Sequence, residues 1–141
     1  MPKVVINDKF GGFELSPHAY KLIAEYRGEP CLFFALEPFH DEKRAYREIS
    51  LEQTAKCHLW YAFNINDPSL ITEDLWAGIE IPDFREDRSN HLLVQVVEEL
   101  GRHANGEYAE LKIVDVPDDV EWFIDGHDGC EWVAEKHRIW R

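Results

Sequence analysis

Positive charge is scarce in this sequence of 141 residues. It has 15 Lys and Arg side chains against 28 Asp and Glu, which gives a net charge of −13. Binding to nucleic acid draws much of its free energy from Lys and Arg contacts with phosphate, so a surface this acidic repels polyanions on average. We therefore expect no direct binding to nucleic acid and none to an anionic membrane.

Long apolar runs are also missing. No stretch approaches the roughly 18 uninterrupted apolar residues that a membrane-spanning helix needs. The apolar run near Met1 is shorter than the core of a signal peptide and is followed at once by Asp8. The sequence therefore predicts no membrane span and a location in the cytoplasm where the chain is made.

Residues that build metal sites and nucleophilic centres are few or scattered. The three cysteines, Cys31, Cys57 and Cys130, are odd in number and form no Cys-x-x-Cys pair, which argues against disulfides and cysteine-bound zinc. The seven histidines show no His-x-x-x-His spacing, and no Gly-x-Ser-x-Gly motif occurs. We expect no metal and no cofactor, assign no catalytic residue, and regard an enzyme as disfavoured but still open.

Apolar residues make up 45% of the chain, enough for one folded domain over residues 1–141. Alternating or continuous apolar segments predict strands, which we place at residues 3–7, 31–36, 46–51, 58–65, 111–116, 121–125 and 130–135. Two principal helices are expected. Ser16 caps the first, and Ser89 caps the second, whose apolar stripe runs from Leu92 to Leu100.

Turn residues divide these elements. We expect an exposed turn at residues 37–44 and a hairpin turn at residues 126–129, and we leave residues 76–83 open as a short strand or an ordered loop. The last three strands are expected to follow one another in antiparallel order. The sequence thus predicts an α+β single domain, a mainly antiparallel sheet with two principal helices and a C-terminal β-hairpin.

Acidic residues are concentrated in the predicted C-terminal hairpin. Residues 115–135 contain eight Asp and Glu and no Lys or Arg. Alternation along each strand predicts a core face with Trp122, Ile124, Trp132 and Ala134. The opposite face is expected to be acidic and holds four carboxylates that we take as candidate partner-binding residues: Glu121, Asp125, Glu131 and Glu135.

The C-terminal part of the chain also carries recognisable motifs. These are LVQVVEELG, ANG, AELKIV, VPDDVEW and EWVAEKHR, followed by Trp140. Together with Ile6-Asn7, Gly11-Gly12-Phe13 and Ser16 they resemble an uncharacterised family of small proteins encoded by bacteriophages and bacteria. The resemblance covers about half of the chain and leaves out residues 29–88. It implies a phage-type accessory protein that acts in the bacterial cytoplasm, and it supplies no catalytic residue.

Two functions follow as hypotheses. The first is a non-catalytic protein that inhibits or modulates a host defence system by placing its acidic hairpin on a host protein with a basic surface. The alternative is a small-ligand protein that sequesters or degrades a nucleotide signal. Its predicted pocket combines the glycine loop with basic and aromatic residues, namely Gly11, Gly12, Arg88, His137, Arg138 and Trp140. Either function is compatible with an oligomer.

Overall fold

The computed structural model describes residues 2–40, 43–56, 60–63, 65 and 84–136. The chain forms two compact units: Met1–Ala19 with Phe84–Arg141, and Tyr20–Asp83. The boundary falls within helix α1 (Pro17–Arg27). We call them the discontinuous unit and the central unit and describe each separately, because their relative positions are not determined.

The discontinuous unit is built around two antiparallel strands distant in sequence. β1 (Lys3–Asn7) pairs with β5 (Leu111–Asp115) from Lys3 opposite Asp115 to Asn7 opposite Leu111. β1 is apolar and β-branched, and four of its five residues are buried. A strand with so few exposed residues must be covered on both faces, and the other elements of this unit supply that cover.

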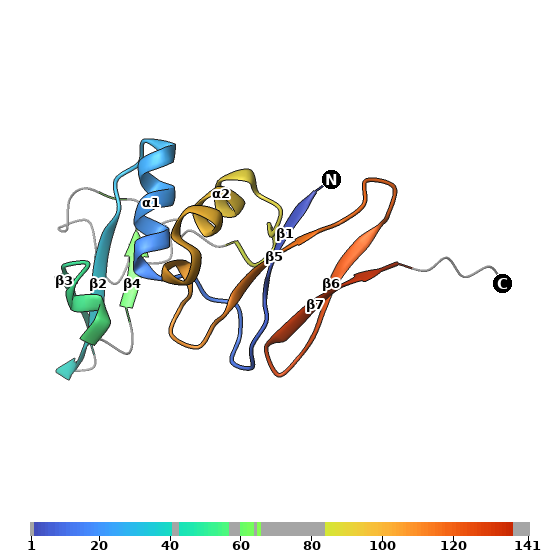
Figure 1. Cartoon of the computed structure of the whole chain (residues 1–141). Helices are drawn as coiled ribbons and strands as arrows, with labels where there is room; N and C mark the ends of the chain where they lie inside the picture. Colours follow the sequence, from blue (N-terminus) through green and yellow to red (C-terminus); the bar gives the residue numbers. More distant parts are fainter. Residues whose placement is uncertain (1, 41–42, 57–59, 64, 66–83, 137–141) are drawn as a thin grey trace. The chain divides into compact units, whose positions relative to one another are not determined.

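Helix α2 (His91–Leu100) contacts β1 and β5, and the hairpin of β6 (Trp122–His127) and β7 (Cys130–Glu135) contacts β1 through β7. Figure 1 shows α2 and the hairpin on opposite sides of the β1–β5 pair. On the hairpin side, Val4 and Ile6 are buried in an apolar cluster. On the helix side, Lys3 Nζ donates a hydrogen bond of 2.8 Å to Glu98 Oε1. Because side chains alternate along β1, the strand contacts the hairpin with one face and α2 with the other.

The first turn of α2 is capped by Asn90, one residue after the Ser89 that we expected. The Asn90 side-chain oxygen accepts hydrogen bonds from the backbone N–H groups of Leu92 and Leu93, at 2.9 and 3.3 Å. The Ser89 prediction is wrong because Asn is as good a cap as Ser, and spacing alone does not choose between neighbours. The stripe itself is confirmed: Leu93, Val96 and Val97 are buried.

The turn between β6 and β7 has two residues, Asp128 and Gly129, with φ of 50° and 87°. Positive φ at both positions is the signature of a type I′ turn, for which Asp-Gly is a favoured pair. The four-residue turn expected at residues 126–129 is therefore wrong. β6 continues through His127, and the pairing places Ile124 opposite Val133 and His127 opposite Cys130.

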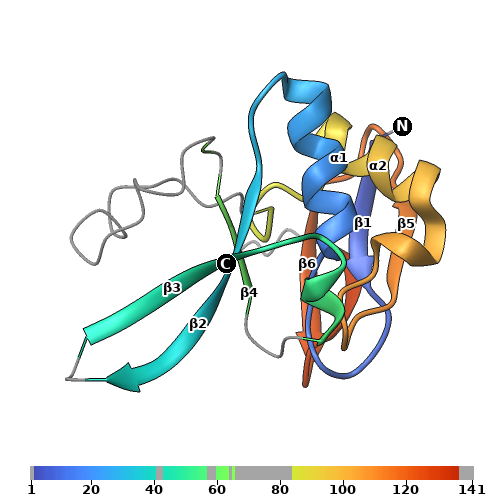
Figure 2. The same ribbon diagram turned by 90° about the vertical axis from the view of Figure 1, so that its left-hand side faces the viewer.

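The central unit contains a three-stranded antiparallel sheet in the order β3-β2-β4, with β2 (Leu32–His40) between β3 (Lys43–Ile49) and β4 (Trp60–Phe63). Figure 2 shows this order. Its core joins Phe33, Ala35, Ile49 and Ala62, and Trp60 packs edge-to-face on Tyr20 of α1 with ring centroids 5.7 Å apart. A short 3-10 helix, η1 (Gln53–Lys56), follows β3.

The exposed turn predicted at residues 37–44 is too long. β2 runs to His40 and β3 begins at Lys43, and Glu37 pairs with Ala45 and His40 with Lys43, with an irregularity between Glu37 and His40. Backbone hydrogen bonding between neighbouring strands has overridden the local turn propensity of the side chains. The segment expected at residues 76–83 lies outside the described residues.

The α+β class is confirmed. The described residues form two α-helices, short 3-10 segments and seven strands, in antiparallel sheets with a C-terminal hairpin. The expected consecutive order of the last three strands is wrong, since β5 pairs with β1 rather than with β6. Another 3-10 helix, η4 (Gly101–Ala104), follows α2 directly. A single domain over residues 1–141 stays a prediction.

Candidate functional site

Arg88 lies at the centre of the discontinuous unit. Arg88 is 7% exposed. Its guanidinium forms a two-pronged ion pair with Glu131, from Nη1 to Oε1 at 2.7 Å and from Nη2 to Oε2 at 2.8 Å. Further N–H groups donate to the backbone oxygens of Val5, at 3.3 Å, and Arg85, at 2.9 Å. The ring of Phe13 lies 3.8 Å from the guanidinium carbon. Four of the five donors of Arg88 are thus engaged within the protein.

Arg88 and Glu131 also form hydrogen bonds with the backbone of β1. The backbone N–H of Val5 donates to Arg88 O at 2.9 Å, and the backbone N–H of Asn7 donates to Glu131 Oε1 at 2.8 Å. Polar backbone groups on a buried strand edge must find partners, which usually belong to a neighbouring strand. Here Arg88 and Glu131 provide those partners and attach β1 to the hairpin.

Asn7 extends this network toward the hairpin turn. Its side chain is fully buried, donates to Lys9 O and Gly129 O at 2.7 Å each, and accepts from the backbone N–H of Glu110 at 2.8 Å. A buried amide with three hydrogen bonds inside the protein has a structural role, and here it connects β1 to the hairpin turn.

The Gly11-Gly12 loop packs against the turn of the hairpin. Gly11 N–H donates to Asp128 O at 3.1 Å. A Cβ atom added at Gly129 would lie 2.4 Å from the backbone nitrogen of Gly12, so the two backbones are in direct contact. This close approach explains the glycine at position 129, whereas Gly11 and Gly12 have φ of +131° and +118°, which side chains rarely adopt.

The structure brings together three members of the predicted ligand site and one of the predicted partner site: Gly11, Gly12 and Arg88 lie near the start of β7, where Arg88 meets Glu131. They contact Asp128, Gly129 and Glu131 of the hairpin. The remaining predicted ligand contacts, His137, Arg138 and Trp140, lie outside the described residues.

The acidic residues of the hairpin do not share one face. Residues directly opposite in an antiparallel pair point to the same side, and the pairs are Trp122 with Glu135 and Asp125 with Trp132. The two-residue turn sets even-numbered residues of β6 opposite odd-numbered residues of β7. The faces expected for β6 are confirmed, since Trp122 and Ile124 pack on the core. Those expected for β7 were wrong, because we placed even-numbered residues of both strands on one face, which requires a turn of odd length.

The resulting inner face carries Trp122, Ile124 and Val133, which pack on the cluster of Val4, Ile6 and Val116. Glu131 is on this side as well, where it meets Arg88, and Glu135 lies at the exposed end of the same face. Glu121 is exposed just before β6 begins, and its backbone oxygen accepts a hydrogen bond from Lys136 N at 2.9 Å.

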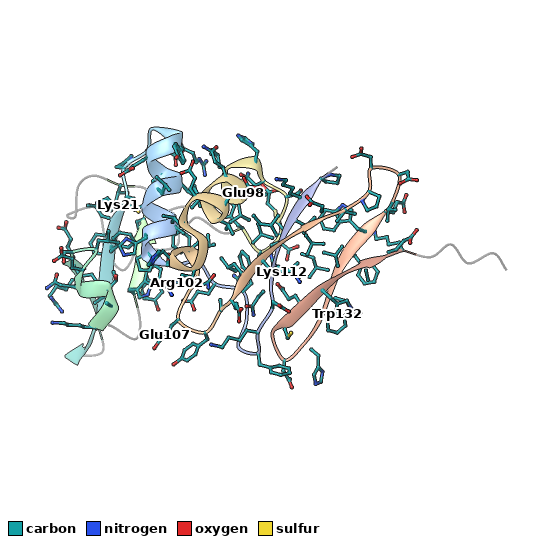
Figure 3. All side chains as sticks on the ribbon, in the orientation of Figure 1. Lys21, Glu98, Arg102, Glu107, Lys112 and Trp132 are labelled. Carbon is teal, nitrogen blue, oxygen red and sulfur yellow. The ribbon has the colours of Figure 1, made fainter. Side chains whose placement is uncertain are left out.

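The outer face of the hairpin, which we define by Phe123, Asp125, Trp132 and Ala134, presents aromatic side chains. Phe123 is 39% exposed and Trp132 is 45% exposed. They are diagonal neighbours across the strand pair, with Asp125 beside them. Figure 3 shows Trp132 on the side of the hairpin away from β1 and β5. Large aromatic side chains at such positions favour contact with another molecule.

Trp132 was missed as a site residue because it was expected in the core, and Phe123, expected on the acidic face, was not selected. Asp128-Gly129 was the signal that could have found them. An Asp-Gly pair between alternating strands predicts a two-residue turn and hence the register. Counting outward from that turn places Trp132 opposite Asp125.

The described residues show no arrangement typical of nucleophilic or metal chemistry. Burial raises the pKa of the Cys31 thiol to about 11, so it is protonated at neutral pH and is a poor nucleophile. Within the described part of the chain, no three His, Cys, Asp or Glu side chains gather in a way that could hold a metal ion.

Comparison of the chain with models of known protein families, with curated proteins and with solved structures gives no match. Among the described residues, neither α-helix is long and apolar enough to cross a membrane.

Proposed function

We propose that this protein is a non-catalytic binding protein that docks on a basic protein surface through the outer face of its C-terminal hairpin. The observation that carries the proposal is the exposure of Phe123 and Trp132 on one face of a two-stranded sheet. Trp is among the residues most often found to dominate binding energy, especially where it is surrounded by groups that exclude water on contact.

Charge favours a basic partner. Asp125 lies on the outer face, and exposed Glu121 and Asp128 lie near the two ends of β6. The net charge of −13 makes association with another acidic protein, including a second copy, electrostatically unfavourable. Complementary charge raises association rates and selects partners, while the aromatic pair supplies apolar contact area.

The resemblance to bacteriophage proteins supports a host protein as the partner class. In this proposal the protein modulates or inhibits a host system by occupying a surface. A nucleotide-binding function receives no comparable support, because Gly11, Gly12 and Arg88 are engaged in the contacts that hold the hairpin.

The test is quantitative capture from bacterial lysate with the full-length protein immobilised. A Phe123→Ala/Trp132→Ala variant should lose the captured protein, and Asp125→Lys should weaken its capture more strongly at low salt than at high salt. Phe10 and Tyr108, 65% and 58% exposed, provide the matched control. The variant Phe10→Ala/Tyr108→Ala should capture as well as the unmodified protein. Capture that is indifferent to the Phe123 and Trp132 changes would overturn the proposal.

A further inference from the structure

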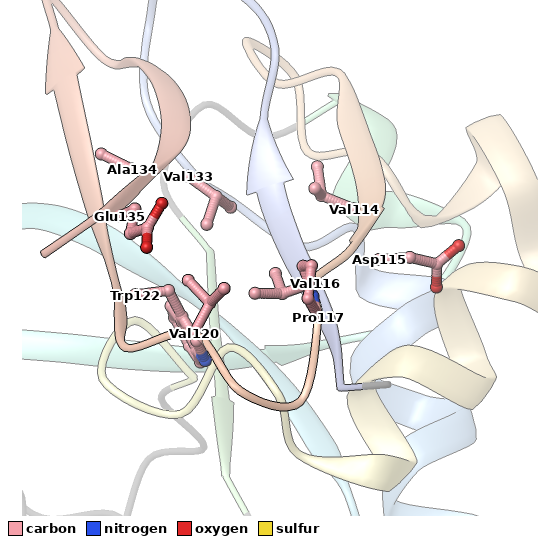
Figure 4. Close-up of a pocket in the computed structure, with 9 residues that line it drawn as sticks. All are labelled: Val114, Asp115, Val116, Pro117, Val120, Trp122, Val133, Ala134 and Glu135. Atoms are coloured by element: carbon pink, nitrogen blue, oxygen red, sulfur yellow. The ribbon is translucent and has the colours of Figure 1, made fainter.

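A second surface lies on the opposite side of the hairpin from the outer face. It is a groove of about 240 Å³ between the end of β5 and the hairpin, which we call the β5–hairpin groove. Figure 4 shows the side chains around it. Its apolar lining comes from Val114, Val116, Pro117, Val120, Trp122 and Val133.

The groove lies over the core of the discontinuous unit. Val116 is buried with Val4 and Ile6, whereas Val114, Val120, Trp122 and Val133 are only partly buried and pack around that cluster. Contact with an apolar group would remove their remaining exposed area from water, which is favourable. The groove is therefore a favourable place for an apolar side chain.

Its size limits what can enter. Pockets for drug-sized molecules and cofactors have volumes of roughly 300–1,000 Å³. A groove of about 240 Å³ that is open to solvent suits one inserted side chain better than a nucleotide. Recognition of extended peptides works in this way, with a pocket for a single side chain and complementary groups for its neighbours.

The acidic charge around the groove favours basic residues next to the inserted side chain. The lining segments, residues 114–122 and 133–135, contain five Asp and Glu and no Lys, Arg or His. The Asp115 carboxylate points away from the groove, while Glu135 lies at its rim (Figure 4). An apolar side chain flanked by Lys or Arg complements both the lining and the rim, whereas an acidic peptide would meet like charge.

We propose that the β5–hairpin groove binds one apolar side chain of a basic peptide segment in a partner protein. The proposal deepens the proposed function by naming what the partner contributes. The outer face and the groove have only Ala134 in common, so each can be tested with variants at other positions that leave the other intact.

The probe is the blocked tripeptide acetyl-Lys-Leu-Lys-amide, added to the full-length protein and followed by two-dimensional NMR. We expect shifts confined to groove residues, notably the Trp122 indole and the methyl groups of Val120 and Val133. The acetyl-Glu-Leu-Glu-amide peptide should bind more weakly, and acetyl-Lys-Gly-Lys-amide should cause no groove shifts. Equal shifts with the Lys- and Glu-flanked leucine peptides, or no shifts at Val120 and Trp122, would overturn the proposal.

Two variants locate the binding. Val120→Trp should fill the groove and abolish the shifts. Glu135→Gln, at an exposed position, should retain the fold and reduce affinity about two- to fivefold, the value of one exposed ion pair. Asp125→Asn on the outer face is the matched control and should leave peptide affinity unchanged. An equal loss in Asp125→Asn and Glu135→Gln would contradict a specific role for the groove.

Other occupants are distinguished by two further measurements. Peptide binding seen only after removal of residues 137–141, which include Arg138, Ile139 and Trp140, would identify the chain's own C-terminus as the occupant and overturn the proposal. Groove shifts that grow with protein concentration alone would identify a second copy and overturn it too. A failed groove test with intact dependence of capture on Phe123 and Trp132 would refute this inference while leaving the proposed function standing.

Discussion

Arg88 and Glu131 form a buried, two-pronged ion pair that joins the segment before α2 to the second strand of the hairpin. Their side chains are 8% and 15% exposed, and their paired atoms are 2.7 and 2.8 Å apart. Together they also bond the backbone of Val5 and Asn7. The pair thus fixes the hairpin against β1, and the outer face and the groove both depend on that placement.

Removal of one partner from this pair should be costly. Glu131→Ala leaves a buried, uncompensated guanidinium and is expected to lower the free energy of unfolding by about 3–5 kcal/mol. Urea unfolding followed by circular dichroism measures the change. Asp125→Ala, at an exposed position on β6, is the matched control and should stay within about 0.5 kcal/mol of the unmodified protein.

The double variant Arg88→Met/Glu131→Leu separates the cost of an orphaned charge from the value of the pair. It should be more stable than Glu131→Ala, since no buried charge is left unpaired. If Glu131→Ala has the same free energy of unfolding as Asp125→Ala, the ion pair does not hold the hairpin against β1.

Gly129→Ala should destabilise the protein through two effects. The residue has φ of +87°, and the added Cβ would lie 2.4 Å from Gly12 N. Backbone strain of this kind costs about 1–3 kcal/mol, and the clash adds to it. At Gly28, with φ of +67°, an added Cβ meets no atom within 4 Å, so Gly28→Ala is the comparison for strain alone. Thermal unfolding should show the larger loss for Gly129→Ala, and equal losses would argue against the contact between the glycine loop and the turn.

The side chain of Asn90 should matter more than that of Ser89. Asn90→Ala removes the acceptor for two N–H groups of α2 and is expected to cost about 1 kcal/mol. Ser89→Ala, one residue earlier and exposed, should change stability by less than about 0.5 kcal/mol. The denaturant midpoints of the two variants measure this difference. A larger loss of stability in Ser89→Ala than in Asn90→Ala would show that Ser89 is the cap.

The charged form of Glu14 should lower the free energy of unfolding at neutral pH. Burial of its carboxyl group raises its pKa above the ordinary value, and the nearby charge of Glu107 acts in the same direction. A raised pKa means that the folded state favours the protonated form, so this contribution to stability is present below the ordinary Glu pKa and is lost as pH rises through the folded value.

Glu14→Gln is therefore expected to be more stable than the unmodified protein at pH 7. The difference should disappear below about pH 4, where both states of the original residue are protonated. Thermal unfolding across this pH range measures it, and the exposed Glu86→Gln serves as the control. A stability gain that persists unchanged at low pH would point to a cause other than ionisation.

Local patterns in the sequence predicted most elements of the fold. The β-branched run at residues 3–7, the capped helix after Ser16, the apolar stripe before Leu100 and the C-terminal hairpin all appear in the structure. These features depend on neighbouring residues and on periodicity, which a single sequence displays directly. The pairing of β5 with β1 could not be predicted in the same way, because it joins segments more than 100 residues apart.

The candidate site was predicted less well for a related reason. Alternation within β7 was read correctly, but the face on which Trp132 lies depends on the register with β6. Arg88 and Glu131 were each selected from the sequence for different functions. Only their distance in the folded chain shows that they bind each other.

The sequence by itself determined the acidic character of the chain, its α+β class and the existence of a C-terminal hairpin, since composition and local periodicity carry that information. The tertiary structure decided how this charge and aromatic content are used. It directed Glu131 inward to Arg88 and left Phe123 and Trp132 exposed, because strand register and long-range packing determine which face of a strand is buried.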